Sequence, residues 1–288
     1  MAGVVAPDAL GGRTSRRAWR KLVGHPSARI GVLVLGIYAT AALLGPLVFP
    51  FDPARNDLAQ NFAPMSAEHP LGTDDLGRDE LLMLVHGARY TLALGFLAVG
   101  VGLLIGVPIG SASGYFGGRL DLISQRFTDV LLAFPGILLA LTLVAGLGVG
   151  LQNVVLAVGI SSTPAFIRLS RASALSIRGL PYVEAARASG AAHSRILLRH
   201  VIPNSLAPLI VQASLQIGGA ILVAAGLGFL GLGVQKPTPE WGSMLGDSRT
   251  YIFSAPHLAT IPGLAIFGAV LAFNLIGDAL RDALDPRL

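Results

Sequence analysis

Six stretches of this chain carry no Asp, Glu, Lys or Arg, and this feature limits its possible folds more than any other. A helix needs about 20 apolar residues to cross the hydrocarbon core of a bilayer, because each residue adds about 1.5 Å. Only 13% of the residues are charged and 53% are hydrophobic, whereas a soluble domain carries about 25% charged residues. We therefore predict an all-α integral membrane protein, a bundle of six transmembrane helices. The six predicted spans are residues 30–49, 91–114, 130–146, 154–167, 206–232 and 258–276.

The first apolar stretch could instead belong to a signal peptide. The apolar part of a signal peptide is about 7–15 residues long and leads to a cleavage site of small residues. Here the stretch is longer and leads to Pro46, Pro50 and Phe51, so an uncleaved first span is the better interpretation. We divide the chain into a polar tail at 1–29, a first transmembrane helix at 30–49, an extracytoplasmic segment at 50–90 and a transmembrane domain at 91–288.

Lysine and arginine are distributed unequally between the two sides of the predicted membrane. Five of them lie on one side, namely Arg55, Arg78, Arg89, Lys236 and Arg249. The others fall in the N-terminal tail, in the loops 117–129 and 168–199, or near the C-terminus. Basic residues accumulate on the cytoplasmic side of membrane proteins. Both termini and the most basic loop, 168–199, are therefore expected in the cytoplasm.

The composition argues against several classes of function. The net charge of +5 does not indicate nucleic-acid binding, because the basic residues flank apolar spans and are not interleaved with aromatic residues. No cysteine is present, which excludes disulfides, thiolate metal sites and cysteine nucleophiles. The zinc-protease pattern H-E-x-x-H is absent, and every histidine lies outside the predicted spans. We expect neither an enzyme nor a bound metal or cofactor in this chain.

A few polar residues interrupt the predicted spans. Ionisable side chains at membrane depth, which proton-coupled pumps and ion-selective pores require, are almost lacking. The polar exceptions are Ser161, Ser162, Gln212, Gln216 and Asn274. They could line a solute pathway, or they could form hydrogen bonds between helices. The sequence leaves both alternatives open.

Two further patterns concern packing. Gly102, Gly106 and Gly110 recur every four residues and so share one helical face, where another backbone can approach closely. Gly226, Gly228, Gly231 and Gly233, near the end of the fifth span, could serve packing or could let the helix break, and we favour the break. Arg126 and Asp129, three residues apart, are expected to form a local ion pair.

The basic loop contains an unusual segment at residues 179–204. Its composition predicts two short helices separated at Gly190, the first at about 182–189 with Glu184 in its opening turn and several alanines behind it. Small side chains would let this helix fit deep into a groove of another protein. Alternatively, Arg187, Arg195 and Arg199 could hold an amphipathic helix on anionic lipid. The composition alone does not separate the two.

The pattern Glu184-Ala185-Ala186, then Gly190, Ile196 and Pro203 resembles the EAA loop of bacterial ABC importer permeases. Two further regions resemble the C-type subunits of the dipeptide, oligopeptide and nickel permeases within that family. They are residues 69–79 with Gly87-Ala88-Arg89, and residues 228–245 with the ending 277–286. The resemblance covers nearly the whole chain. Lys236 departs from it, since the family often has proline there.

This resemblance implies a fold, a mechanism and a set of partners. The fold would be that of type I ABC importer permeases, in a bacterial plasma membrane. Residues 179–204 would form a coupling loop that inserts into a groove of a separate ATPase subunit. The residues in contact would be Glu184, Ala185, Ala186, Arg187, Ala188, Gly190, Ile196 and Pro203. ATP and magnesium would bind to two such ATPase subunits, because this chain lacks the phosphate-binding pattern G-x-x-x-x-G-K-[ST]. A second permease subunit would complete a heterodimer in the lipid membrane.

The resemblance also implies that an extracytoplasmic solute-binding protein delivers peptides to the pathway. The same machinery could import nickel chelates, glutathione or another small solute, and an ATP-independent transporter or channel is the alternative from another class. The outer residues Asp74, Asp75, Arg78, Pro237, Glu240 and Trp241 would then face the binding protein. Residues 73–79 could instead form a capped turn that leads into a short helix near 81–85.

The predicted topology can be tested with two single cysteines in this naturally cysteine-free chain. We expect a membrane-impermeant maleimide, added to intact cells, to label Ser66→Cys and not Ser194→Cys, because only the first lies outside. Permeabilised cells provide the control, since both cysteines should then react. Labelling of Ser194→Cys in intact cells would contradict the topology.

Overall fold

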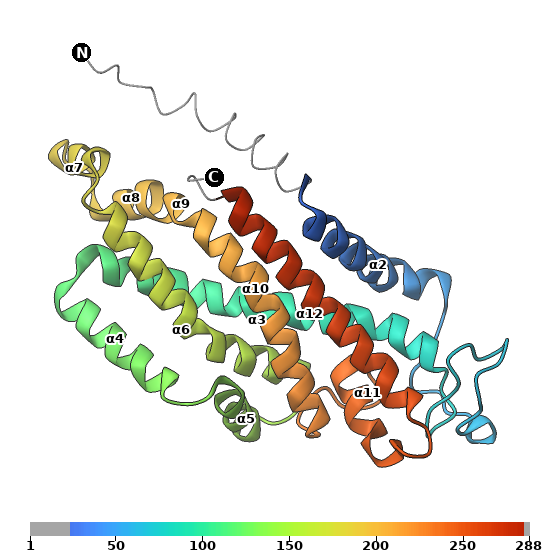
Figure 1. The fold of residues 1–288 in the computed structure, drawn as a ribbon. Helices are drawn as coiled ribbons and strands as arrows, with labels where there is room; N and C mark the ends of the chain where they lie inside the picture. The colour runs from blue at the N-terminus through green and yellow to red at the C-terminus, as the bar shows by residue number, and fades with distance from the viewer. Residues whose placement is uncertain (1–23, 285–288) are drawn as a thin grey trace.

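The computed structural model describes residues 24–284, and within this range the chain is helical apart from its loops and one isolated β-bridge (Figure 1). The predicted all-α fold is confirmed. The long helices are α2 (Pro26–Val48), α3 (Glu80–Phe116), α4 (Gly118–Leu132), α5 (Gly136–Leu147), α6 (Leu151–Ile177), α10 (Leu206–Phe229) and α12 (His257–Leu284). The short ones are η2 (Leu58–Gln60), α7 (Pro181–Ala188), α8 (His193–Ile196), η3 (Leu197–Val201), α9 (Ile202–Asn204), α11 (Trp241–Ser248) and η4 (Arg249–Tyr251).

Five continuous helices of the described residues, α2, α3, α6, α10 and α12, are long and apolar enough to cross a membrane. The pair α4 and α5 passes the same test only when it is taken as one broken span. The six predicted crossings therefore correspond to five continuous helices and one bent pair. The basic residues of the tail before Gly24, and Arg287 at the other end, lie outside the described residues.

The predicted span 130–146 is not a single helix. α4 ends at Leu132, α5 begins at Gly136, and the two helix axes differ by 89°. Pro135 lies at the break, directly before α5, and its ψ of 132° is not helical. Proline disfavours helical angles in the residue before it, and Pro135 follows Phe134 directly. The apolar run conceals this break because hydropathy is continuous across it.

Ion pairs attach α4 to α6. The Arg171 guanidinium donates to both carboxylate oxygens of Asp121, from Nε at 2.5 Å and from Nη2 at 2.7 Å. Arg168 Nη2 donates to Asp129 Oδ1 at 2.9 Å. The predicted local pair of Arg126 with Asp129 is therefore wrong, because the carboxylate points to the neighbouring helix.

At the glycines of α3, the helices α3 and α6 lie so close together that a side chain larger than hydrogen would clash. A Cβ added at Gly106 would lie 3.0 Å from the Thr163 carbonyl oxygen and 2.6 Å from Phe166 Cβ. Gly102 and Gly110, one turn to either side, face the same segment of α6. The predicted packing role of this glycine series is confirmed, and a fourth member, Gly114, extends it to the end of α3.

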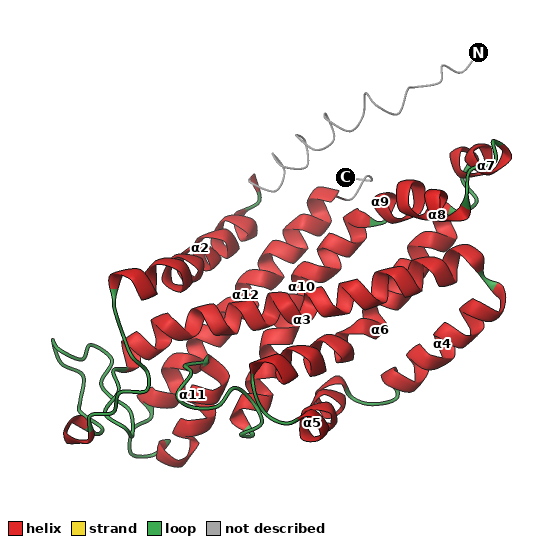
Figure 2. Cartoon of the chain, turned by 180° about the vertical axis from the view of Figure 1, so that it is seen from behind, coloured by secondary structure: helices red, strands yellow, loops and turns green. Residues whose placement is uncertain are grey.

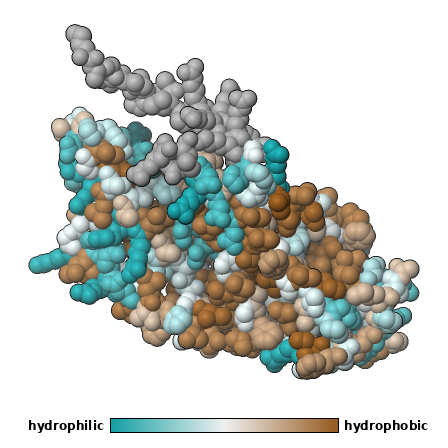
Figure 3. All heavy atoms as spheres, viewed as in Figure 1, coloured by the Kyte–Doolittle hydropathy of each residue, from teal (hydrophilic) through white to brown (hydrophobic). Residues whose placement is uncertain are grey.

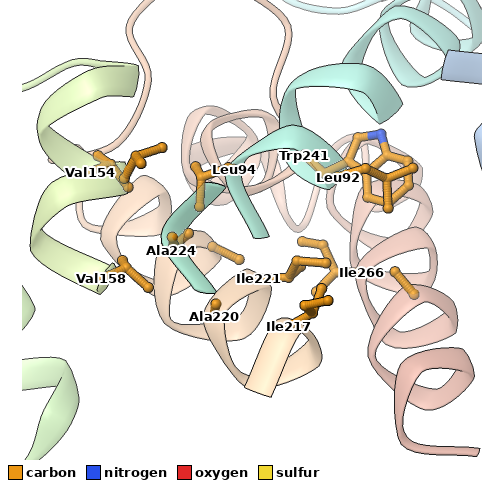
Figure 4. Close-up of a cluster of buried hydrophobic side chains, with 14 of the residues drawn as sticks. Leu92, Leu94, Val154, Val158, Ile217, Ala220, Ile221, Ala224, Trp241 and Ile266 are labelled. Carbon is orange, nitrogen blue, oxygen red and sulfur yellow. The ribbon is translucent and has the colours of Figure 1, made fainter. Parts of the chain in front are cut away.

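The main core lies where α3, α6 and α10 meet α11 and α12 (Figure 4). Its side chains come mostly from Leu, Ile, Val and Ala residues of these helices, and Trp241 at the start of α11 is fully buried among them. α10 ends at Phe229, and Gly231 follows with a positive φ of 79°. The predicted glycine break at the end of the fifth span is confirmed.

The outer segment before α3 is a loop held by side-chain caps. Asp79 caps α3 by accepting a hydrogen bond from Leu82 N at 2.9 Å. α3 then continues from Glu80 to Phe116 without interruption. The short helix predicted near 81–85 is thus the first part of the long helix and not a separate element, because the helical hydrogen-bond ladder passes through Arg89 and Tyr90.

The exposed surface matches a membrane protein. Large apolar side chains are exposed along α2, from Ile30 to Phe49, as expected for a helix that faces lipid. Figure 3 shows hydrophobic residues over the long helices and hydrophilic residues towards the end that carries α7. Seen from either side, α2 and α4 lie at opposite edges of the bundle (Figures 1 and 2).

The first residues of α2 and the last residues of α12 lie together. His25 Nε2 is 3.6 Å from Asp282 Oδ2, and both lie towards the end of the bundle that carries α7, α8 and α9 (Figure 1). The start of α2 and the end of α12 therefore lie at the same end of the bundle as the basic loop, while the two termini lie outside the described residues. Which compartment that side faces stays a prediction.

The close packing of α3 on α6 generates a stability prediction. Gly106→Ala should lower the free energy of unfolding by about 1–3 kcal/mol, because the added methyl group forces the two helices apart. Gly100→Ala in the same helix should cause no loss, since nothing lies within 4 Å of its added Cβ. Thermal unfolding of the purified protein in detergent compares the two. Equal stability of the variants would contradict the packing role.

Candidate coupling site, inner groove and outer surface

The basic loop folds as the sequence predicts, into a short helix and a second helical segment separated at Gly190. The first helix, α7, begins with Pro181, which suits the first helical position because it needs no amide hydrogen. Gly190 has a φ of 78°, a left-handed conformation that favours glycine and turns the chain. The second segment runs through α8, the π-helical turn η3 and α9.

One buried valine anchors α7 to the bundle. Val183 is fully buried in a second apolar cluster, separate from the main core. The other buried members of the cluster are Tyr115, Ala174, Ile177, Ile196 and Val201. Tyr115 and Ile177 come from the ends of α3 and α6, so those two helices support the loop. Val183 belongs to no motif and was not among the predicted residues, although it is the one aliphatic residue larger than alanine in this helix.

The remaining face of α7 is open. Glu184, Ala185 and Ala188 are exposed, and Ala186 is half-buried against the anchoring cluster. Within residues 24–284, no hydrogen bond or ion pair engages the Glu184 carboxylate. The helix therefore exposes small alanine side chains beside the Glu184 carboxylate, together with Tyr182 and Arg187.

Polar contacts join the loop to the end of α3. The Tyr115 hydroxyl and His193 Nδ1 are 2.9 Å apart, and the Arg187 guanidinium lies 5.7 Å from the centre of the Tyr115 ring. Arg178 Nη1 donates to the Gly114 carbonyl oxygen at 3.0 Å. Tyr115 thus contacts both halves of the loop, and α7 is held at a fixed place relative to α3.

A groove of about 550 Å³ opens at the same end of the bundle. It is lined by Leu169, Ala207, Pro208, Val211, Gln212, Leu215, Arg281 and Leu284, from α6, α10 and α12. Of the five predicted pathway residues, only Gln212 lines it. Gln216 is half-buried one turn further along α10, and Asn274 is half-buried on α12. Ser161 and Ser162 donate to carbonyl oxygens of their own helix, at 2.8 Å each.

Four of the six predicted outer docking residues are buried. The Glu240 carboxylate caps α11 by accepting hydrogen bonds from Gly242 N at 2.9 Å and Ser243 N at 3.0 Å, and it also accepts from the Thr91 hydroxyl. Trp241 Nε1 donates to the Leu84 carbonyl oxygen at 2.9 Å. These side chains fasten α11 to α3, so they shape the outer surface without reaching it.

Asp74 and Arg78 form a buried ion pair in the outer loop. Arg78 Nε and Nη2 lie 2.7 and 2.6 Å from Asp74 Oδ2, and Asp74 Oδ1 accepts from the amides of Leu76 and Arg78. The capped turn that the sequence left as an alternative is therefore present, with Asp74 as the acceptor inside it. This pair, too, is engaged within the chain.

Lys236 bridges two outer elements. Its ammonium group lies 3.4 Å from a carboxylate oxygen of Asp75 and 3.4 Å from one of Asp247. Burial raises the pKa of the Asp247 carboxyl above its usual range, and the Lys236 charge partly opposes that shift. The lysine that departs from the family pattern thus links the loop before α3 to α11. Pro237 beside it is exposed.

None of these regions resembles a metal centre. Among residues 24–284, no group of three or more histidine, aspartate or glutamate side chains is arranged to hold a metal ion. The features that the geometry does offer are an exposed helix rich in alanine, a groove at the same end of the bundle and a structured surface at the opposite end.

Known proteins with similar sequences are transport proteins. Residues 106–288 match the family described as "Binding-protein-dependent transport system inner membrane component", and residues 14–69 match the "N-terminal TM domain of oligopeptide transport permease C". The dipeptide transport system permease protein DppC of Alkalihalophilus pseudofirmus is 46% identical over 95% of this chain and 90% of its own length. The glutathione transport system permease protein GsiD of Pectobacterium atrosepticum is 47% identical over 95% and 91%.

Solved structures share the fold. A chain of the MetNI methionine ABC transporter in an inward-facing conformation superposes with a TM-score of 0.58 at 21% identity, over 70% of this chain and 97% of that one. A chain of an amino acid ABC transporter gives a TM-score of 0.52 at 19% identity, over 69% and 94%. At these identities the likeness concerns the fold alone.

The anchoring role of Val183 can be tested by hydrogen exchange. Val183→Ala removes two buried methyl groups and should weaken the local structure by about 2 kcal/mol. Amide protection across residues 181–204 should fall while that of α3 and α6 is retained. Leu198→Ala is the control in the same loop, because Leu198 is exposed. Similar exchange in both variants would contradict the anchor.

Proposed function

This chain belongs to the family of binding-protein-dependent inner membrane transport components, and from that premise we propose that it is a permease subunit of an ATP-binding-cassette importer of peptides. The observation that carries the proposal is α7, a helix that Val183 holds against the bundle and whose exposed side carries Glu184 among alanines. Such a helix suits insertion into a groove of another protein better than adsorption to lipid, since Tyr182 is the one large hydrophobic side chain that α7 exposes.

We infer the substrate class from the substrates that the names of the similar proteins give. One is a dipeptide permease and another a glutathione permease, and glutathione is itself a small peptide. Small peptides are therefore the substrates that these relatives support best. Nickel chelates, suggested by the sequence resemblance, are the next candidates. The groove beside Gln212 does not decide among them, because it is mostly apolar and carries one arginine.

Coupling to ATP would occur through α7. Two ATPase subunits would bind ATP and magnesium, and each would receive the coupling helix of one permease subunit. When the ATPases close, α7 would move with them and shift the attached ends of α3 and α6. The bundle then acts as an element with two states, whose equilibrium is set by different contacts in each nucleotide state.

The solute would pass along α10. In the described conformation the groove opens at the end of the bundle that carries the coupling loop, as expected of a state that releases solute inwards. Gln212 supplies the amide group that contacts solute there, and Gln216 is the next polar step along the same helix. We assign a structural role to Ser161 and Ser162, since their hydroxyl groups donate hydrogen bonds to carbonyl oxygens of α6.

The outer surface would receive the solute-binding protein. Asp75 and Pro237 lie nearest to solvent there, whereas Asp74, Arg78, Glu240 and Trp241 hold the surface in shape from within. A second permease subunit would complete the pathway, in a heterodimer embedded in the lipid of a bacterial plasma membrane.

A bulky side chain on the exposed face of α7 should weaken the coupling between this chain and the ATPase subunits. In proteoliposomes that hold the complete complex, we expect Glu184→Trp to lower binding-protein-stimulated ATPase activity and uptake by about tenfold, a loss of about 1.4 kcal/mol in coupling. The indole would prevent close contact and would remove the free carboxylate.

Ala192→Trp is the matched control, because Ala192 is exposed in the same loop but lies outside α7. It should retain coupled transport. Wild-type coupling in Glu184→Trp would count against the coupling role, and uptake by this chain in vesicles without any ATPase would overturn the importer proposal.

A further inference from the structure

A small cavity lies where the loop before α3 meets α3, α11, η4 and α12, at the end of the bundle away from the coupling loop (Figure 1). Its volume is about 20 Å³. The titratable and charged residues that line it are Asp74, Asp75, Arg78, Glu80, Asp247 and Tyr251. We call this space the outer cavity, and residues 50–79 the outer loop.

Glu80 differs from the other acidic residues of the outer cavity because its side chain has no partner. It is the first residue of α3, before the predicted span 91–114, and it is only 3% exposed. Its Oε1 atom is buried and has no hydrogen-bond partner among the described residues. Burying an ionised carboxylate without a partner costs far more than burying the neutral acid. The geometry therefore favours the protonated form of Glu80.

The cations near the outer cavity are already paired. Arg78 Nη2 lies 2.6 Å from Asp74 Oδ2. The Lys236 ammonium lies 3.4 Å from a carboxylate oxygen of Asp75 and 3.4 Å from one of Asp247. These two cations are thus shared among three other carboxylates, and neither is left to neutralise Glu80.

The remaining titratable groups around Glu80 add no positive charge that is free. Asp79 Oδ2 is 2.9 Å from His69 Nδ1. His257 of α12 has a buried Nε2 atom without a partner among the described residues, and it lies beside Gly72. The Gly72 carbonyl oxygen in turn accepts from Glu80 N at 3.1 Å.

The pKa of Glu80 agrees with this geometry. Burial raises the pKa of the carboxyl from 4.5 to about 8. The negative charges of Asp74 and Asp79 add to the rise, and the positive charge of Arg78 opposes it. Glu80 is therefore mostly protonated at neutral pH.

The size of the outer cavity limits what it can bind. About 10–15 Å³ of such space suffices for one water molecule, whereas pockets for small organic ligands measure about 300–1,000 Å³. A peptide is thus far too large. No group of three or more side chains suited to a metal ion occurs within residues 24–284. A proton on Glu80 fits, with room for one water molecule beside it.

Few contacts join the outer loop to the helices on the other side of the cavity. The Phe62 ring packs edge-on against Tyr251 of η4, with ring centres 4.8 Å apart. Asp75 pairs with Lys236, which is 38% exposed. A negative charge on Glu80 would repel the carboxylates that the loop already carries. The ionisation of Glu80 would therefore oppose the closed position of the outer loop.

We propose that the outer cavity is a protonation site: with a proton on Glu80 the outer loop stays closed on α11 and η4, and loss of that proton opens it. Its consequence for transport rests on the proposed function. The surface proposed to receive the solute-binding protein keeps its shape only while Glu80 is neutral, so the external pH sets the fraction of molecules in which that surface is formed.

The direction of the pH dependence follows from proton binding. The closed loop binds the proton more tightly than the open loop, in which the pKa of Glu80 returns towards 4.5. The closed state is therefore fully favoured below pH 4.5 and loses stability as the pH rises to about 8. Between about pH 6 and pH 8, the open fraction should increase more than tenfold.

Hydrogen exchange of the full-length chain, purified with the subunits that accompany it, tests the proposal. Between pH 6 and pH 8, and after correction for intrinsic exchange rates, amide protection in residues 57–79 should fall more than tenfold in the wild type. Glu68→Gln is the matched control and should behave in the same way, because Glu68 is exposed in the same loop. Glu80→Gln keeps the shape of the side chain but cannot ionise, so its protection should stay nearly constant. A wild-type pH dependence in Glu80→Gln would overturn the proposal.

Infrared spectroscopy of the wild type detects the proton directly, which keeps the proposal testable if Glu80→Gln does not fold. The carbonyl band of a protonated carboxyl should be present at pH 6 and should decrease with a midpoint near pH 8. Absence of this band at pH 6 would overturn the proposal.

Neither measurement requires transport, so the two proposals can fail separately. If the pH dependence is found but the complex does not import peptides, the protonation site stands and the proposed function fails. If the complex imports peptides but the wild type and Glu80→Gln exchange alike, the importer proposal stands and the protonation site fails.

Discussion

The close approach of α3 and α6 is the contact on which the rest of the structure depends. Four glycines of α3 allow the backbones to touch along most of their shared length. In a membrane, helix association gains little from the hydrophobic effect, so close packing of this kind carries much of the stability. Because the two helices are fixed against each other, their ends are fixed too. The coupling loop lies at one end of this pair, and the capped start of α3 with α11 lies at the other.

This arrangement explains how motion at the coupling loop can reach the groove. Val183 connects α7 to α3 and α6, and the loop continues through α9 directly into α10, whose first residues line the groove. In the proposed mechanism, a displacement of α7 would be transmitted along two routes, through packing to α6 and through the chain to α10. Both routes end at the groove beside Gln212. The outer ends are fastened differently, by buried hydrogen bonds of Glu240 and Trp241.

Features that depend on local sequence could be predicted, and those that depend on distant partners could not. The glycine series of α3 and the turn at Gly190 follow from spacing and composition, and both are confirmed. The bend between α4 and α5 lies within an uninterrupted apolar run, so hydropathy gave no sign of it, although Pro135 marked the position. The partner of Asp129 is Arg168, on another helix, and a rule based on sequence separation selected Arg126 instead.

The same distinction applies to the candidate site. The sequence indicated which residues of the coupling loop share a pattern, but it could not show which of them face outwards. Side chains that hold the loop, such as Val183 and Tyr115, carry no motif and are recognised only by burial. The outer residues Glu240 and Trp241 show the converse, since a distinctive motif there reflects internal packing. A sequence motif thus indicates that certain residues are needed. Only the structure shows whether a partner needs them or the fold of the chain itself.

The charged side chains separate into two groups by this criterion. Asp121, Asp129 and Asp74 are each satisfied by an arginine of the same chain, which stabilises the fold and leaves nothing for a partner. Within residues 24–284, Glu184 and Arg126 have no such partner, yet both are carried by ordered helices. Glu184 projects beside small side chains and Arg126 beside large ones. Because neither charge is paired within the described residues, both are open to groups outside the chain, and they contribute to the surface of the protein more than to its fold.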